Sequence, residues 1–307
     1  YSKIGCHYFS DSRTRELARQ FYKDLTVLAE RREHDGAISM MRKYGHQTGE
    51  IWQQIRAEAE HLAQTEPQLA GLLSDVVIDR PCLGNAIAAR LARKLSREDM
   101  SRNELMPLLQ DIFVKNPNVT ASVTADMLAI YDRDPACQSV LEPMLFFKGL
   151  MALATYRVSH YLWTMNRKSL ALYFQSLSSE VFGVDIHPAA RIGCGILFDH
   201  ATSIVIGETA IVEDDVSILH EVTLGGTGKD EGARHPIVRS GVLIGAGAKI
   251  LGRVEIGSCA KIGAGSVVLE EVAPHTTVAG VPAILVGTNS EDAPALGMNQ
   301  RLECGNI

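Results

Sequence analysis

The spacing of apolar residues divides the chain into two halves. Up to about residue 180, apolar side chains recur every three or four positions, which predicts amphipathic helices. One helix is expected within residues 10–33, where Leu17, Phe21, Leu25 and Leu28 share a face. Others are expected at 49–65, 83–95, 101–115 and 118–131, with a longer pair over 142–181. We interpret this half as a helical bundle that serves packing and assembly.

From Val184 onward the apolar spacing changes to six residues. A second apolar or small residue stands two places before each repeating position, as a short strand with one buried face requires. Glycine often follows the repeating position, and we expect it to provide a turn at positive φ. Three such strands would close a triangular coil, and stacked coils would bury a continuous aliphatic column. A parallel solenoid of another coil size is the alternative. The repeating positions are Ile186, Ile192, Phe198, Ile206, Val212, Ile218, Leu224, Val238, Ile244, Ile250, Ile256, Ile262 and Val268.

The six-residue spacing is interrupted twice, and both interruptions carry ionisable side chains. The first is an eight-residue step that contains Asp199 and His200. The second is a fourteen-residue step whose loop, GGTGKDEGARHP, contains Arg234 and His235. Irregularities in repetitive β-structure often re-aim side chains beside active sites, and long solenoid loops often lie on the binding face. We therefore expect the functional site at these two interruptions.

Other ionisable residues nearby have simpler interpretations. His187 precedes a proline and is expected to be a turn residue, and Asp214–Asp215 resembles a solvated turn. His220 could line a subunit boundary, and no chemical role is assigned to it. A zinc site would need ligands clustered in space. His200, His220 and His235 are widely spread along the chain, so no metal is expected.

Composition excludes several classes of function. Among 307 residues, 46% are apolar and 21% charged, and the net charge is −6 without a basic cluster, which argues against a nucleic-acid partner. The most apolar window, from Leu141, is interrupted by Lys148, Arg157 and His160, so no membrane span is expected. No signal peptide is visible. Six dispersed cysteines without a C-x-x-C pair favour reduced thiols and a cytoplasmic location, with disulfides as the alternative.

Several motifs together resemble the serine O-acetyltransferase family. In the second half they are VDIHPAARIG, FDHATSIVIGETAIVEDDVSILHEVTLGGTGK, RHPIV, GVLIGAGAKILG, KIGAGSVV and AGVPA; in the first, YDRDPA and FFKGLMALATYRVSHYLW are similar too. The combination of DHAT and RHP separates this family from other hexapeptide acyltransferases. The chain departs from the family at Ser203, where glycine is usual, and at Ala233, where aspartate is common.

The resemblance implies an α+β fold and a division of the chain into four parts. A helical domain over residues 41–183, which also serves the serine site, would precede a left-handed parallel β-helix of hexapeptide repeats over 184–287. Residues 1–40 would form an extension of unknown role. Residues 288–307 are polar and lack periodicity, so a flexible tail is expected.

The implied reaction transfers acetyl from acetyl-CoA to the hydroxyl of L-serine, giving O-acetylserine for cysteine biosynthesis. A hydroxyl is a poor nucleophile at neutral pH, so a base must remove its proton, and imidazole has a suitable pKa. The family pattern assigns this role to His200, with Asp185 accepting a hydrogen bond from the other ring nitrogen. Such a carboxylate fixes the tautomer and stabilises the imidazolium. Direct transfer without an acyl-enzyme is expected.

The resemblance also implies how the two substrates bind. Asp134 and Asp199 would hold the ammonium group of serine, and Arg234 and His235 its carboxylate, which a guanidinium can bind through two parallel hydrogen bonds. CoA would lie between neighbouring copies in a homotrimer or a dimer of trimers. The implied CoA contacts are Gly225, Gly226, Thr227, Ala246 and Lys261.

The end of the chain, with Ile307 as its last residue, resembles tails that insert into the active site of O-acetylserine sulfhydrylase. A frayed end is the alternative. L-cysteine, which resembles serine, is expected to act as a feedback inhibitor at the serine site. Two other functions are weighed: an acyltransferase for another acceptor such as an amino sugar, and a non-catalytic partner that tethers a sulfhydrylase through its tail. Asp134 and the Arg234–His235 pair argue against a neutral sugar.

Overall fold

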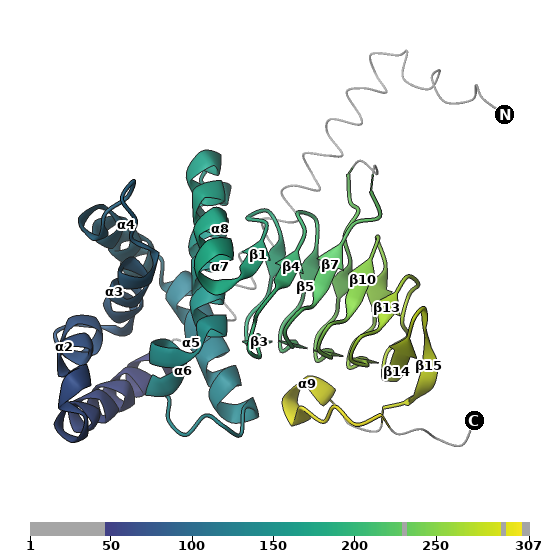
Figure 1. The fold of residues 1–307 in the computed structure, drawn as a ribbon, viewed down its shortest axis with the longest axis horizontal. Helices are drawn as coiled ribbons and strands as arrows, with labels where there is room; N and C mark the ends of the chain where they lie inside the picture. Colours follow the sequence, from purple (N-terminus) through teal and green to yellow (C-terminus); the bar gives the residue numbers. More distant parts are fainter. Residues whose placement is uncertain (1–46, 229–231, 290–292, 303–307) are drawn as a thin grey trace, which may run out of the picture.

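The computed structural model describes residues 47–228, 232–289 and 293–302. A group of helices precedes a β-solenoid, and the helices stack against one end of it (Figure 1). The helix expected within residues 10–33 and the extension over 1–40 lie outside the described residues, as does Ile307. The change of apolar spacing near Val184 coincides with the boundary between the helices and the solenoid.

The helices follow the predicted spacing closely. A helix over residues 47–65 comes first. Ser101 and Glu104 form a capping box at the start of α4 (Arg102–Lys115), and Pro117 occupies the first turn of α5 (Pro117–Arg133). Gly183, at φ 67°, ends α8 (Lys168–Phe182). The expected pair over 142–181 is three helices, because the chain breaks at Phe147 and again near Asn166. The remaining helices are η1 (Pro67–Leu69), α2 (Ala70–Leu73), η2 (Ser74–Ile78), α3 (Leu83–Leu95), α6 (Leu141–Phe146) and α7 (Lys148–Thr164).

Helix α7 joins the helical group to the solenoid. It is buried over most of its circumference, in contact with α5 and α8 and with the first coil. Gly149 allows this contact, because a Cβ there would lie 2.2 Å from the carbonyl oxygen of Phe198. No described helix is long and apolar enough to cross a membrane.

A buried ion pair fixes the same junction. Arg157 on α7 donates two hydrogen bonds of 2.8 Å to the carboxylate of Asp126 on α5. The guanidinium also donates to the Gly193 carbonyl (2.9 Å), and Asp126 accepts a hydrogen bond from the Ile196 amide (3.0 Å). Asp126 is fully buried. Because the charges are paired and hydrogen-bonded to the first coil, they set the orientation of the helices relative to the solenoid.

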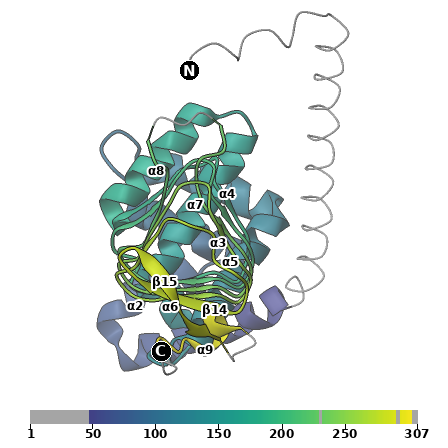
Figure 2. The ribbon, with the colours of Figure 1, turned by 90° about the vertical axis from the view of Figure 1, so that its right-hand side faces the viewer.

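The solenoid confirms the six-residue repeat. Viewed end on, its coils superpose as a triangle (Figure 2). Successive strands go to three different parallel sheets, with the orders β1-β4-β7-β10-β13, β11-β8-β5-β2 and β15-β14-β12-β9-β6-β3, and only β15 is antiparallel to its neighbour. The strands are β1 (Val184–Ile186), β2 (Arg191–Ile192), β3 (Leu197–Phe198), β4 (Ile204–Ile206), β5 (Ile211–Val212), β6 (Ser217–Ile218), β7 (Thr223–Gly225), β8 (Ile237–Val238), β9 (Leu243–Ile244), β10 (Lys249–Leu251), β11 (Glu255–Ile256), β12 (Lys261–Ile262), β13 (Val267–Val268), β14 (Thr276–Gly280) and β15 (Ala283–Thr288).

The repeating side chains fill the prism as expected, and of the repeating positions only Ile192 is partly exposed. The role expected for the following glycine is wrong. The glycines at 193, 207, 245, 257 and 263 are not among the residues with positive φ. They are needed for space: a Cβ at Gly245 would lie 2.6 Å from the backbone nitrogen of Ala264, one coil further along. Close stacking of corners, not turn geometry, is the physical reason for these glycines.

The described part of the C-terminal segment differs from the expected flexible tail. Residues Pro294–Gly297 form a short helix, α9. Ala295 is fully buried, its amide donates to the Gly241 carbonyl (3.2 Å), and its carbonyl accepts a hydrogen bond from the Ser217 hydroxyl (2.8 Å). This segment therefore packs back along the solenoid toward the helices (Figure 1).

Candidate active site

The first interruption of the repeat is the corner between β3 and β4. His200, Ala201 and Ser203 all have φ near 60°, and Ala201 is buried, so the two extra residues are absorbed by left-handed backbone. The side chain of His200 is 74% exposed, outside the prism, and that of Asp199 is 21% exposed. His200 Nε2 lies 3.8 Å from the Asp199 carboxylate. Non-glycine residues with positive φ cost energy and cluster at functional sites.

The helical group contributes Asp134 to the same region. Asp134 follows the last residue of α5, and its carboxylate accepts a hydrogen bond from the Ala136 amide (2.9 Å). The preceding Arg133 is buried and holds this helix end on the solenoid, donating to Asp215 (3.0 Å) and to Ser217 (3.2 Å). Asp134 is thereby brought to the corner that carries Asp199 and His200.

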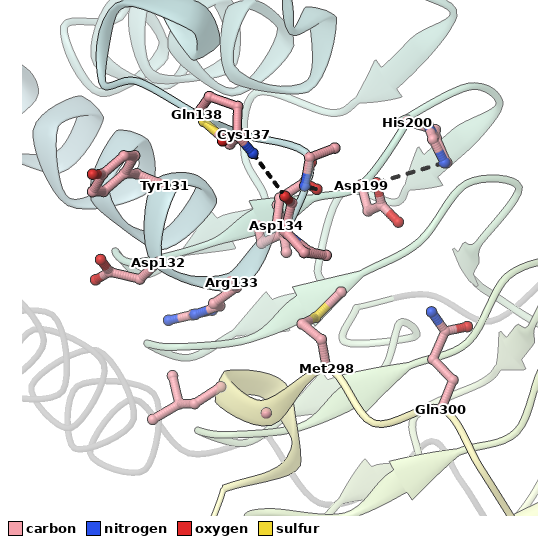
Figure 3. Close-up of a pocket in the computed structure, with 15 residues that line it drawn as sticks. Tyr131, Asp132, Arg133, Asp134, Cys137, Gln138, Asp199, His200, Met298 and Gln300 are labelled. Atoms are coloured by element: carbon pink, nitrogen blue, oxygen red, sulfur yellow. Dashed lines mark hydrogen bonds and ion pairs between the residues drawn. The ribbon is translucent and has the colours of Figure 1, made fainter.

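These three side chains line one pocket of about 960 Å³. Figure 3 shows Asp134, Asp199 and His200 on one side of it and Met298 and Gln300 of the C-terminal segment on the other. Two carboxylates beside an imidazole suit an acceptor that carries an ammonium group and a hydroxyl. Nothing in the sequence pattern indicated that Met298 or Gln300 would lie here.

His220 lies one coil away at the same edge of the prism. Its ring makes an edge contact with that of His200, with centroids 5.6 Å apart. Its Nδ1 is buried without a hydrogen-bond partner. The next corner of this edge holds Ala246, because the Gly247 amide donates to the His220 carbonyl (2.9 Å). The ring contact with His200 was not expected from the sequence.

The second interruption lies at a different edge of the prism, between β7 and β8. Arg234 donates to Glu208 (2.7 Å), and this hydrogen bond holds the pKa of Glu208 below its usual value. The His235 ring packs over Gly207, where a Cβ would lie 2.0 Å from its Cδ2 and Nε2. Burial, and next the charge of Arg234, lower the pKa of His235. The ring is therefore neutral at neutral pH.

Within one chain, the residues predicted to act together fall into two groups. Asp134, Asp199 and His200 share one edge of the prism, and Arg234 and His235 share another. Asp185 points outward from β1 and accepts a hydrogen bond from Gln175 (2.6 Å). No hydrogen bond or ion pair of the described residues links Asp185 to His200.

Asp185 is electrostatically coupled to His187, on which Arg234 of the second group also acts. Burial lowers the pKa of His187, and the charges of Glu208 and Asp185 oppose this shift only in part. His187 follows β1 at the edge where Glu208 follows β4. Burial also raises the pKa of Cys194 to about 12, so this thiol does not supply a thiolate nucleophile at neutral pH.

The residues expected to contact CoA are divided in the same way. Gly226 lies beside the Arg234–His235 pair, and Gly225 and Thr227 flank it in the sequence. Ala246 belongs to the edge of His200. Lys261 is buried, and its ammonium group donates to the Arg301 carbonyl (3.3 Å). Among the described residues no cluster of three or more His, Cys, Asp or Glu could hold a metal ion.

Comparisons with known proteins identify the family to which the chain is similar. A family model described as "Serine acetyltransferase, N-terminal" matches residues 51–155, and one described as "Bacterial transferase hexapeptide (six repeats)" matches 235–270. A model of the FadR C-terminal domain matches residues 1–63. A serine acetyltransferase from Haemophilus influenzae is 51% identical over 253 residues, which are 82% of this chain and 95% of that protein.

Solved structures with bound ligands are similar as well. A serine acetyltransferase from Brucella abortus in complex with coenzyme A has a TM-score of 0.77 and 49% identity, covering 78% of this chain and 96% of that one. A serine acetyltransferase in complex with cysteine has a TM-score of 0.81 and 50% identity, covering 83% and 99%. The soybean enzyme complexed with serine has a TM-score of 0.76 and 49% identity, covering 78% and 98%. With such identity over most of its length, this chain belongs to the serine acetyltransferase family of acyltransferases.

Proposed function

We propose that this chain transfers the acetyl group of acetyl-CoA to the hydroxyl of L-serine at a site formed between two copies of itself. One observation carries the proposal: the side chains suited to the ammonium group and hydroxyl lie at one edge of the prism, and those suited to the carboxylate lie at another. Serine is too small to reach both edges of one prism. A neighbouring copy that presents its Arg234–His235 edge to the His200 edge would complete the pocket.

The chemistry follows from the groups at these two edges. Asp134 and Asp199 bind the ammonium group, and the Arg234 guanidinium and the neutral His235 ring donate hydrogen bonds to the carboxylate. His200 takes the hydroxyl proton as the serine oxygen attacks the thioester carbonyl. The tetrahedral intermediate then expels the CoA thiolate, which receives the proton from the imidazolium of His200. The protein itself is not acetylated, which agrees with the raised pKa of Cys194.

Asp185 is proposed to orient His200 across the same interface. Two observations support this: its charge acts on His187, as do those of Glu208 and Arg234, and no hydrogen bond or ion pair of the described residues links it to His200 of its own chain. In the assembly, the carboxylate of one copy would face the imidazole of the next and accept its second ring N–H. A head-to-tail contact that closes after three copies gives a homotrimer with identical sites. Two trimers joined through their helices would give the dimer of trimers.

Further expectations depend on this site. CoA would lie in the groove between copies, with Gly225, Gly226 and Thr227 on one wall and Ala246 on the other. L-cysteine would compete with serine, since it offers the same ammonium and carboxylate groups. Binding of a sulfhydrylase through Ile307 and a cytoplasmic location remain predictions.

Mixing two inactive variants tests the shared site. Purified alone, His200→Ala and Arg234→Ala should each release thiol from acetyl-CoA about 100-fold more slowly than the wild type at low serine. In mixed trimers of the two variants, about one site in four receives an intact His200 from one chain and an intact Arg234 from the other. Activity should therefore return to roughly a quarter of the wild-type level.

A matched pair of variants provides the control. Asp199→Ala and His200→Ala alter the same edge of the prism, so mixed trimers of these two should recover no activity. The shared site would be disproved if the His200→Ala and Arg234→Ala chains exchanged subunits and stayed inactive. Near-normal turnover by His200→Ala alone would reject this residue as the base.

A further inference from the structure

The turn between β4 and β5 contains a threonine that contacts both residues of the carboxylate-binding pair. The hydroxyl oxygen of Thr209 accepts hydrogen bonds from the backbone amides of Arg234 (2.9 Å) and His235 (3.1 Å). The same oxygen lies 2.9 Å from Nδ1 of the His235 ring, and the Thr209 amide donates to that nitrogen (3.2 Å). Thr209 thus holds the backbone of Arg234 and His235, and also the ring of His235, one coil further along.

Counting hydrogens at this contact assigns the tautomer of His235. A hydroxyl has one hydrogen and two lone pairs. Both lone pairs of Thr209 receive backbone N–H groups, so its hydrogen points to Nδ1 of His235. The Thr209 amide points to the same nitrogen and can only donate. Nδ1 is therefore an acceptor, and the proton of the neutral ring is on Nε2.

The other side of the ring is free to meet a ligand. Nε2 of His235 has no hydrogen-bond partner among the described residues, and it is not one of their fully buried unpaired atoms. Gly207 leaves room for it, since a Cβ there would lie 2.0 Å away. The Arg253 guanidinium links the two segments as well, because it donates to the carbonyls of Thr209 (3.1 Å) and His235 (3.0 Å).

We infer that Thr209 is a positioning residue that fixes His235 as its Nε2–H tautomer, so that the ring can only donate to the acceptor's carboxylate. This inference depends on the proposed carboxylate-binding role of His235. It adds a source of specificity. Arg234 and His235 then both donate, and the two oxygens of a carboxylate can accept both hydrogen bonds. The amide group of L-serinamide has only one accepting oxygen, and its NH₂ group would face a second N–H donor. Without the Thr209 hydroxyl, the ring could carry its proton on Nδ1 and accept from such an amide.

Two substitutions at Thr209 separate this role from simple packing. Thr209→Val keeps the shape and removes the hydroxyl, so two backbone amides and the ring lose their partner. It should raise KM for L-serine by about 10- to 100-fold, with kcat changed by less than about threefold. KM for acetyl-CoA should stay unchanged. The ratio of kcat/KM for L-serine to kcat/KM for L-serinamide should decrease. Thr209→Ser keeps the hydroxyl and should remain close to wild type in every parameter.

Nitrogen NMR of the wild-type trimer gives a reading that does not depend on how well Thr209→Val folds. With ¹⁵N-labelled histidine, and His235→Gln to assign the signal, His235 should show an unprotonated Nδ1 and a protonated Nε2 at pH 7.5. A proton on Nδ1, a Thr209→Val enzyme with wild-type KM for serine, or a Thr209→Ser enzyme as impaired as Thr209→Val would each overturn the inference. Failure of the mixed-variant experiment would remove the proposed site but leave the tautomer assignment standing.

Discussion

The contact between α7 and β3 allows the sign of a glycine substitution to be predicted. In an exposed helix, Gly→Ala stabilises a protein by about 0.5–1 kcal/mol, because alanine has less backbone entropy to lose. At Gly149, however, the new Cβ would lie 2.2 Å from the Phe198 carbonyl oxygen, whereas Cβ contacts under 3.0 Å essentially never occur. The contact must open by 3.0 − 2.2 = 0.8 Å.

This displacement should affect both stability and catalysis. Overpacking costs about 1–3 kcal/mol, which outweighs the helix gain, so the free energy of unfolding of Gly149→Ala should fall by about 1–2 kcal/mol. Phe198 directly precedes Asp199 and His200, and a misplacement of about 1 Å can cost up to 100-fold in rate. We expect kcat to fall by about 10- to 100-fold in a thiol-release assay.

Gly71 in α2 provides the matched control. A Cβ at this position meets nothing within 4 Å. Gly71→Ala should be slightly stabilised in urea unfolding and fully active. If Gly149→Ala proved as stable and active as Gly71→Ala, α7 would not set the position of the β3–β4 corner, and the reasoning would be refuted.

Three other substitutions test separate features. Ser203→Gly should raise the free energy of unfolding by about 0.5–1 kcal/mol, because φ is 60° there; an unchanged urea midpoint would contradict this. Arg157→Leu should destabilise by about 3–5 kcal/mol by leaving Asp126 buried and unpaired, and Asp126→Leu in the same chain should recover part of the loss; no recovery would count against the pair. Because burial lowers the pKa of His235 from 6.5, the unfolded chain binds more protons than the folded chain below that pH, and the free energy of unfolding falls as the pH decreases. His235→Gln should make this dependence of stability on pH shallower. An unchanged dependence would reject a buried neutral ring.

The sequence predicted the solenoid because its repeat depends on local geometry. A strand of two or three residues needs only its own i/i−2 pair to show which face is buried, so each position from Ile186 to Val268 carries the signal independently. The interruption at Asp199–His200 was visible for the same reason. The role of the glycines was misassigned because the contact at Gly245 depends on Ala264 in the following coil, which spacing alone does not describe.

The less predictable parts of the site depend on contacts between distant segments. Thr209 contacts His235 only because the chain, after the second interruption, returns to the edge of the prism that carries Thr209. Met298 reaches the pocket only because α9 packs back along the prism. Such contacts are set by coil register and by the path of a segment without periodicity. The division of the predicted site between two edges is likewise a property of the prism and has no counterpart in the linear motif.

The antiparallel strand at the end of the solenoid has a consequence for solubility. A stack of parallel coils has no inherent last member, and an open final coil would offer unpaired backbone groups to another stack. At one end α7 and α8 cover the first coil; at the other, β15 reverses direction against β14, with a register shift between Thr277 and Val278. A chain that lacked β15 would expose β14 as a template for end-to-end growth. In this one of the three sheets, the hairpin therefore blocks the edge on which another stack could add.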